Sequence, residues 1–319
     1  MAKKQAGQSI RTQDGRFQTY IRTQNQPTHF AIGFRLAGAG RLDTNLTRIL
    51  LSRGPIATLA ASLEHKITER LSQVRSTLDT EQQRQSKNTL AQIEHFIRLQ
   101  SYMGADFLMP DMHAWPISPD LGVLLIRLVE AGGYDAVIEF GSGVSTVILA
   151  QALIKTAALT NAQPAPLLSF EHLEHYFEQT AAMLRQARLH KRVDLRLAPL
   201  VPFNAPNDRD YPYYDCGTAL RELRERLNAV TPHILVLVDG PPAATGPQAR
   251  YPALPALLDA FGDQAHFDLL MDDYIRPDER DILNRWQALL TEQGRLFQTH
   301  DYPKLEKQAC LLQLKACPA

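Results

Sequence analysis

The sequence predicts an α/β fold: a mostly parallel seven-stranded sheet with helices on both faces and a closing antiparallel hairpin, preceded by a mainly helical extension. Three observations predict it. Short apolar runs alternate with helical patterns through the last two thirds of the 319 residues, which is typical of parallel strands joined by helices. Two further strand-like segments flank a polar turn near the C-terminus. Apolar residues spaced by three and four in the N-terminal third indicate helix.

Residues 1–110 form the predicted N-terminal extension. Strand-like segments within residues 16–36 flank Asn25-Gln26-Pro27, so we expect a hairpin there. An amphipathic helix follows, although polar residues 81–88 interrupt its apolar stripe. Two interpretations stay open: a helix or helical hairpin that packs on the next domain, and a dimerising coiled coil that would make the protein a homo-oligomer. The apolar positions are Leu59, Leu63, Ile67, Leu71, Val74, Leu78, Leu90, Ile93 and Ile97.

Residues 111–319 form the predicted second domain. It opens with a linker and an amphipathic helix over residues 121–131, which Ser118 would cap and Pro119 would begin. Strands and helices then alternate to the end of the chain. The predicted strands are residues 137–140, 167–171, 193–197, 234–238, 267–271, 294–299 and 308–314, and the predicted helices are residues 147–154, 176–184, 219–229, 254–261 and 279–290.

Composition narrows the classes of function. Lysine plus arginine and aspartate plus glutamate both number 34, so the zero net charge gives no electrostatic case for binding nucleic acid or an anionic membrane. The three cysteines form no Cys-x-x-Cys pair and suit a reducing compartment. No run approaches the roughly 20 apolar residues of a membrane span, and no apolar signal core follows the basic N-terminus. We therefore expect a cytoplasmic protein without a membrane span.

The most informative segment is a glycine turn. An apolar run ends in Glu139, two glycines follow at Gly141 and Gly143, and a helical pattern begins at once. This indicates a buried strand, a tight turn and a helix N-terminus, where glycines allow the backbone to approach a ligand closely. Thr146 stands where a dinucleotide fingerprint has its third glycine, and the lysine of a phosphate-binding P-loop is missing. An NAD(P)-dependent oxidoreductase is therefore disfavoured.

A second acid, Glu171, ends the next predicted strand and precedes His172. A carboxylate at that place in a βαβ unit can accept hydrogen bonds from both hydroxyls of a ribose. A solvated charge at a helix N-terminus is the simpler alternative. Its position one unit after the glycine turn favours ribose binding.

These motifs, together with the hairpin ending, resemble the class I S-adenosylmethionine (SAM) methyltransferases, whose first motif commonly reads Glu-x-Gly-x-Gly. The resemblance extends from about residue 115 to the C-terminus. It implies a Rossmann-like fold, SAM as cofactor and methyl transfer as the reaction. The segment before the first strand often folds over the cofactor in such enzymes. The implied cofactor contacts are Trp115, Ser118, Glu139, Gly141, Ser142, Gly143, Ser145, Thr146, Glu171 and His172.

Three carboxylates follow two predicted strands at their C-terminal ends, where open α/β sheets bind ligands: Asp239, Asp272 and Asp273. Converging carboxylates repel one another unless they are protonated or neutralised by a cation, and oxygen ligands suit Mg²⁺, Ca²⁺ or Mn²⁺. Acids that only cap a helix or shape a turn are the alternative.

The placement of these acids is similar to that in metal-dependent O-methyltransferases, of the catechol type and of the macrocin and novobiocin sugar type. That resemblance implies that Asp239, Asp272 and Asp273 bind a divalent cation and that Asp239 also accepts a proton. Gly240-Pro241-Pro242 after the first acid departs from the sugar enzymes. It looks more like a bacterial group of class I methyltransferases associated with surface-glycan biosynthesis.

Two loops are candidates for binding the methyl acceptor. Residues 202–217 are predicted to form a loop whose aromatic and acidic side chains, including Tyr213, Tyr214 and Asp215, suit a sugar or polyol. Arg250, after the fourth strand, could meet a phosphate or carboxylate of the acceptor. A surface loop and a surface ion pair are the simpler alternatives.

We therefore expect a SAM-dependent methyltransferase that acts on a hydroxyl of a sugar, a glycan precursor or a small molecule. A catalytically inactive SAM-fold scaffold protein is the second hypothesis, and an NAD(P)-dependent oxidoreductase is the third.

Overall fold

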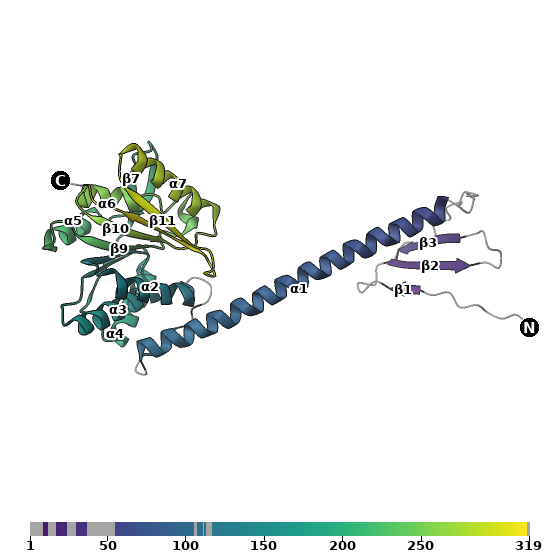
Figure 1. Cartoon of the computed structure of the whole chain (residues 1–319), viewed down its shortest axis with the longest axis horizontal. Helices are drawn as coiled ribbons and strands as arrows, with labels where there is room; N and C mark the ends of the chain where they lie inside the picture. The colour runs from purple at the N-terminus through teal and green to yellow at the C-terminus, as the bar shows by residue number, and fades with distance from the viewer. Residues whose placement is uncertain are drawn as a thin grey trace, which may run out of the picture. The chain divides into compact units, whose positions relative to one another are not determined.

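The structure is a computed structural model, and it describes residues 9–11, 17–23, 30–36, 55–104, 107–110, 112 and 117–317. The chain divides into two compact units, Met1–Gln83 and Arg84–Ala319 (Figure 1). In the first unit the described strands pair in the order β1-β2-β3. β2 and β3 are antiparallel, in agreement with the predicted hairpin. The bounds are β1 (Ser9–Arg11), β2 (Phe17–Thr23) and β3 (Phe30–Leu36).

Helix α1 (Pro55–Met103) is continuous over 49 residues, so the polar residues 81–88 interrupt the apolar stripe but not the helix. The solvent exposure of its apolar side chains differs between the two units. In the first unit Ile67 and Leu71 are 58% and 64% exposed. In the second unit Leu99 and Met103 are buried in the core. The last turns of α1 therefore belong to the core of the second unit, ahead of the expected domain start at residue 111.

The second unit is built on a seven-stranded sheet with the strand order β11-β12-β10-β9-β4-β5-β6. Neighbouring strands are parallel from β10 to β6, whereas β12 is antiparallel to both β10 and β11. This confirms the predicted mostly parallel sheet with a C-terminal antiparallel hairpin. The strands are β4 (Ala136–Phe140), β5 (Leu167–Glu171), β6 (Val193–Leu197), β9 (His233–Val238), β10 (His266–Met271), β11 (Phe297–Tyr302) and β12 (Ala309–Leu314).

Helices cover both faces of the sheet, and each face has its own apolar core (Figure 1). The end of α1 packs on one face with α2 (Pro119–Gly132), α3 (Val144–Thr160) and α4 (Glu174–Gln186). The other face is covered by α5 (Gly217–Arg226), α6 (Ala253–Phe261) and α7 (Pro277–Glu292). In the described parts of the chain, each helix is too short or too polar to span a lipid bilayer.

Residues 202–217 are not one loop, as predicted, but contain two strands joined by a turn. β7 (Leu200–Asn204) and β8 (Asp210–Tyr214) pair as an antiparallel hairpin, and α5 begins at Gly217. Prolines and polar residues suggested a loop, but exposed and buried side chains alternate from Asp210 to Tyr213, as they do in a strand. Tyr211 and Tyr213 are buried, whereas Pro212 between them is exposed. One face of the hairpin therefore packs on the body of the unit.

The strand order places a crevice at the carboxyl end of β4. This strand lies between β5 and β9 and pairs with both. The chain leaves β4 toward β5 and β6 on one side and later returns to β9 and β10 on the other. In open α/β sheets, ligands bind at the point where the strand order reverses in this way.

Candidate functional site

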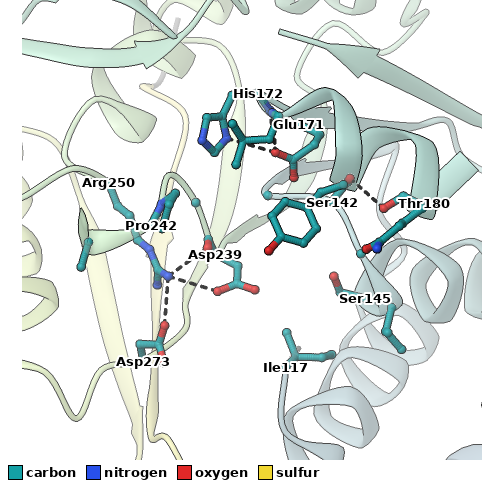
Figure 2. A pocket seen from close by; sticks show the side chains of 18 of the residues that line it. Ile117, Ser142, Ser145, Glu171, His172, Thr180, Asp239, Pro242, Arg250 and Asp273 are labelled. Atoms are coloured by element: carbon teal, nitrogen blue, oxygen red, sulfur yellow. Dashed lines mark hydrogen bonds and ion pairs between the residues drawn. The ribbon is translucent and has the colours of Figure 1, made fainter. Parts of the chain in front are cut away.

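A cavity of about 770 Å³ lies at the carboxyl ends of β4, β5, β9 and β10 (Figure 2). Its size is that of a small-molecule site. One side is formed by the turn after β4 and by α4, and the other by the segments that follow β9 and β10. Residues that are far apart in sequence therefore line one cavity.

The turn after β4 requires glycine at its first position. Gly141 has φ +99°, and its amide donates to the carbonyl oxygen of Phe170 over 3.0 Å. A Cβ atom on Gly141 would lie 3.1 Å from the carbonyl carbon of Asp239 and from the nitrogen of Gly240. The turn after β4 therefore packs directly against the turn after β9.

Glu139 lies beneath this turn and is fully buried, away from the cavity wall. Its Oε2 accepts hydrogen bonds from Thr146 Oγ1 at 2.5 Å and Ser169 Oγ at 2.6 Å. Thr146 Oγ1 in turn accepts from the amide of Gly143 at 2.9 Å. Burial raises the pKa of the Glu139 carboxyl to about 7, although hydrogen bonds from Ser145, Ser169 and Thr146 oppose the rise. In this structure Glu139 thus stabilises the turn after β4 through Thr146.

Glu171 lines the cavity at the end of β5. Its Oε1 accepts hydrogen bonds from the amides of His172 and Leu173 at 2.8 and 2.9 Å, which fixes the carboxylate. Among the described residues, none donates a hydrogen bond to Oε2. One carboxylate oxygen is therefore held by the backbone, and the other is available to a ligand's hydroxyl groups.

The structure brings six of the ten predicted cofactor residues to the wall. Ser118, Glu139 and Thr146 are buried and do not line the cavity, and Trp115 lies outside the described residues. Ser118 is the N-cap residue of α2, as predicted, but its Oγ makes no hydrogen bond. The wall residues are Gly141, Ser142, Gly143, Ser145, Glu171 and His172.

One face of α4 lines the cavity although the sequence did not predict it. Tyr176, Thr180 and Met183 recur at intervals of four and three, so they share a helix face, and all three line the cavity. Thr180 Oγ1 accepts a hydrogen bond from Ser142 Oγ at 3.0 Å, which joins α4 to the glycine turn. The signal was present as helical spacing directly after Glu171.

The three predicted acids converge. One carboxylate oxygen each from Asp239, Asp272 and Asp273 lie within 4.8 Å of one another. Asp239 and Asp273 line the cavity, whereas Asp272 is 1% exposed and neither of its oxygens has a hydrogen-bond partner. Burial raises the pKa of Asp239 to about 6, a rise that Arg250 opposes and Asp273 reinforces. Burial, together with the other two carboxylates, also raises the pKa of Asp272.

Arg250 joins these acids rather than projecting into open space. Its side chain is 4% exposed, and Nη2 lies 3.2 Å from Asp239 Oδ1 and 2.9 Å from Asp273 Oδ2 (Figure 2). Arg276 Nη1 approaches the same oxygen of Asp273 at 2.8 Å. Even so, the clustered carboxylates, with both oxygens of Asp272 unpartnered, form a donor set of the kind that hard divalent cations prefer. The residues present therefore fit such an ion.

The structure separates the predicted acceptor residues. Tyr214 lines the cavity with 2% exposure, and its ring meets that of His172 edge-on at 5.7 Å between centroids. Tyr213 is instead fully buried in the core, and its hydroxyl has no partner. Asp215 is exposed and lies off the wall. The local pattern placed three neighbours together, but only Tyr214 reaches the cavity, although its ring lies 5.2 Å from that of Tyr213 in the same apolar core.

No protein-family model matches the sequence, and no curated protein does. The chain is similar in structure to the O-methyltransferase TomG of Streptomyces achromogenes, solved with SAM: 15% identity over 63% of this chain and 82% of that chain, TM-score 0.42. It is also similar to an O-methyltransferase of Bacillus cereus in complex with SAH, at 15% identity over 70% of this chain and 91% of that chain, with a TM-score of 0.42. The SAH-bound Podospora anserina methyltransferase PaMTH1 is 15% identical over 72% of this chain and 88% of that chain, with a TM-score of 0.42. At this level of similarity, function must be inferred from the site itself.

Proposed function

We propose that this protein is a SAM-dependent methyltransferase that methylates a hydroxyl group of a sugar, a glycan precursor or a small molecule. The observation that carries the proposal is one cavity with two chemically different sides. One side has the glycine turn and Glu171 with a free carboxylate oxygen, and the other has Asp239. A nucleoside and a hydroxyl acceptor would suit these two sides. The buried free cysteines Cys216 and Cys310 are consistent with a cytoplasmic location.

The residues on the first side fit SAM. Glu171 can accept hydrogen bonds from ribose hydroxyls through Oε2, because only Oε1 is engaged by the backbone. Gly143 leaves open space, since no atom lies within 4 Å of a Cβ built there. When bound, SAM supplies a methyl group already activated by the positive sulfonium.

The chain's own part in the reaction is alignment and proton removal. The methyl carbon would leave sulfur and bond to the acceptor oxygen, and the hydroxyl proton must pass to a base. Asp239 faces the cavity, and one of its oxygens is held by Arg250 while Oδ2 accepts no hydrogen bond from the described residues. We propose that Asp239 takes that proton.

The cofactor assignment is tested by substituting Glu171. Glu171→Ala should lose the ribose hydrogen bonds and weaken SAM binding by about 1–3 kcal/mol, the cost of leaving such groups unpaired. Titration calorimetry with SAM, S-adenosylhomocysteine and NAD measures this. Glu174→Ala, an exposed acid one turn further along the chain, is the matched control and should bind SAM as the wild type does.

Unchanged SAM affinity in a folded Glu171→Ala variant would remove the basis for the assignment. Binding of NAD in place of SAM would favour an oxidoreductase. SAM binding without methylation of any hydroxylated surrogate would favour the scaffold hypothesis.

A hard divalent cation is a further part of the proposal. Asp239, Asp272 and Asp273 would hold it, and the unpartnered oxygens of Asp272 are the observation that favours it. Such an ion lowers the pKa of a hydroxyl group that it binds.

If the cation is required, turnover should collapse in EDTA and return with Mg²⁺ or Mn²⁺. Asp272→Asn should mimic that loss, because it removes an anionic ligand while nearly keeping the shape. SAM affinity should stay unchanged in both cases. Full turnover in EDTA would contradict the metal site and leave Asp239 as a base that works without metal.

A further inference from the structure

We propose that Arg250 is a positioning residue for the proposed proton transfer: it holds Asp239 so that one carboxylate oxygen is fixed and the other is open to the cavity. This inference rests on the proposed function. It differs from the expectation that Arg250 meets an anionic group of the acceptor. The contacts of the Arg250 guanidinium group support the inference.

The guanidinium joins the ends of two neighbouring strands. Nη2 donates to the carbonyl oxygen of Asp239 at 2.9 Å and to its Oδ1 at 3.2 Å, both just after β9. The same atom donates to Asp273 Oδ2 at 2.9 Å, and Nη1 donates to the carbonyl oxygen of Asp272 at 3.1 Å, both just after β10. Nε reaches the carbonyl oxygen of Pro241 at 3.5 Å. One planar group thus holds two turns in a fixed relation.

These contacts leave Asp239 with a defined orientation. Its amide donates to the carbonyl oxygen of Phe140 at 3.0 Å, which anchors the backbone to the end of β4. Its Oδ1 accepts from Arg250, whereas none of the described residues donates to Oδ2. A carboxylate fixed at one oxygen cannot rotate freely. The other oxygen is therefore left for a hydroxyl group in the cavity that Asp239 lines.

An anionic acceptor group is a poor alternative partner for Arg250. All three of its nitrogen atoms already donate, and the side chain is 4% exposed. Glu279 Oε1 lies 3.8 Å from Nη1 in addition to the two aspartates, so an incoming anion would meet several carboxylates. Arg276, whose side chain is 43% exposed and which lines the same cavity, is open to solvent where Arg250 is not.

The first test is Arg250→Lys, which keeps the charge but cannot reproduce the planar set of donors. We expect kcat for a hydroxylated surrogate to fall by about 10- to 100-fold, while the SAM dissociation constant and the acceptor KM change by less than about threefold. Formation of S-adenosylhomocysteine gives kcat and KM, and calorimetry gives SAM affinity. Arg196→Lys is the matched control, because Arg196 pairs with Asp194 and Glu222 away from the cavity.

A double-mutant cycle with Asp239→Asn separates positioning from a general structural role. If Arg250 acts through Asp239, Arg250→Lys should lower kcat little further in the Asp239→Asn background. Additive losses would overturn the inference, and so would a raised acceptor KM at wild-type kcat. A wild type that binds no SAM overturns the proposed function, and this inference with it. A wild type that turns over with additive losses overturns this inference alone.

Chemical rescue keeps the test valid if Arg250→Lys does not fold. Added guanidinium ion, at concentrations that leave the wild type folded, should restore kcat in Arg250→Gly. Recovery of the melting temperature without recovery of kcat would overturn the inference.

Discussion

At the scale of single residues, the two glycines after β4 serve different purposes. Gly141 has φ +99°, in the left-handed region, and packs against the backbone of Asp239 and Gly240. Gly143 has an extended backbone, and a Cβ there would enter open space. The fold therefore requires glycine at the first position, whereas at the second a side chain would meet only the cavity, where we propose that the cofactor binds.

This contrast gives a prediction. Gly141→Ala should lower the free energy of unfolding by about 1–3 kcal/mol, because a side chain is strained at that φ and meets the neighbouring turn. Gly143→Ala should leave stability nearly unchanged and weaken SAM binding, because its methyl group takes up space beside the cavity. Urea denaturation and calorimetry measure the two effects. Equal losses of stability in both variants would contradict the assignment.

At the scale of elements, α1 carries apolar residues that none of the described residues bury. Ile67, Leu71, Val74 and Leu78 are spaced by four, three and four, and they are 55–64% exposed. In proteins most helical stability comes from packing of an apolar face, and this spacing is that of a coiled-coil seam. A second copy of the chain would offer the same seam, so homo-oligomerisation through α1 stays a prediction.

We expect light scattering to give a molar mass for the wild type above that of one chain. The double variant with Leu71→Ser and Leu78→Ser should have the mass of a monomer. Arg75→Ser with Thr80→Ser, on exposed positions between and beyond the seam residues, is the matched control. A wild type that is monomeric at all concentrations would contradict the prediction.

At the scale of the whole molecule, the sequence predicted the sheet well because its signals are local. The parallel strands β4, β5, β9 and β10 are short, mostly apolar runs; Glu171 ends β5, and Asp239 and Asp272 directly follow β9 and β10. What it did not predict depends on packing between distant segments. Arg250 looked available to a ligand, but its partners lie on two different strand ends. Similarly, only the pairing of β7 with β8 shows that Tyr213 faces the core.

The extent of the folded unit is a further prediction at this scale. Leu99 is fully buried, and a Cβ on Gly122 of α2 would lie 3.0 Å from its Cδ1. Gln92 Nε2 also donates to Asp120 Oδ2 at 2.7 Å. A chain that starts at residue 84 should melt cooperatively, whereas one that starts at residue 111 should lose at least the roughly 2–5 kcal/mol of one large buried side chain. Calorimetry on both chains measures this, and equal melting temperatures would contradict it.

The contact between the turns after β4 and β9 has a consequence for the order of events at the site. In the proposed function Gly141 lies beside the cofactor and Asp239 beside the acceptor, and a Cβ on Gly141 would lie only 3.1 Å from the backbone of Asp239. A shift of either turn on loading one ligand must be accommodated by the other. Coupling between two binding equilibria is reciprocal. We therefore expect SAM to change acceptor affinity by the same factor by which the acceptor changes SAM affinity. The affinity measured for one ligand would then depend on whether the other is bound.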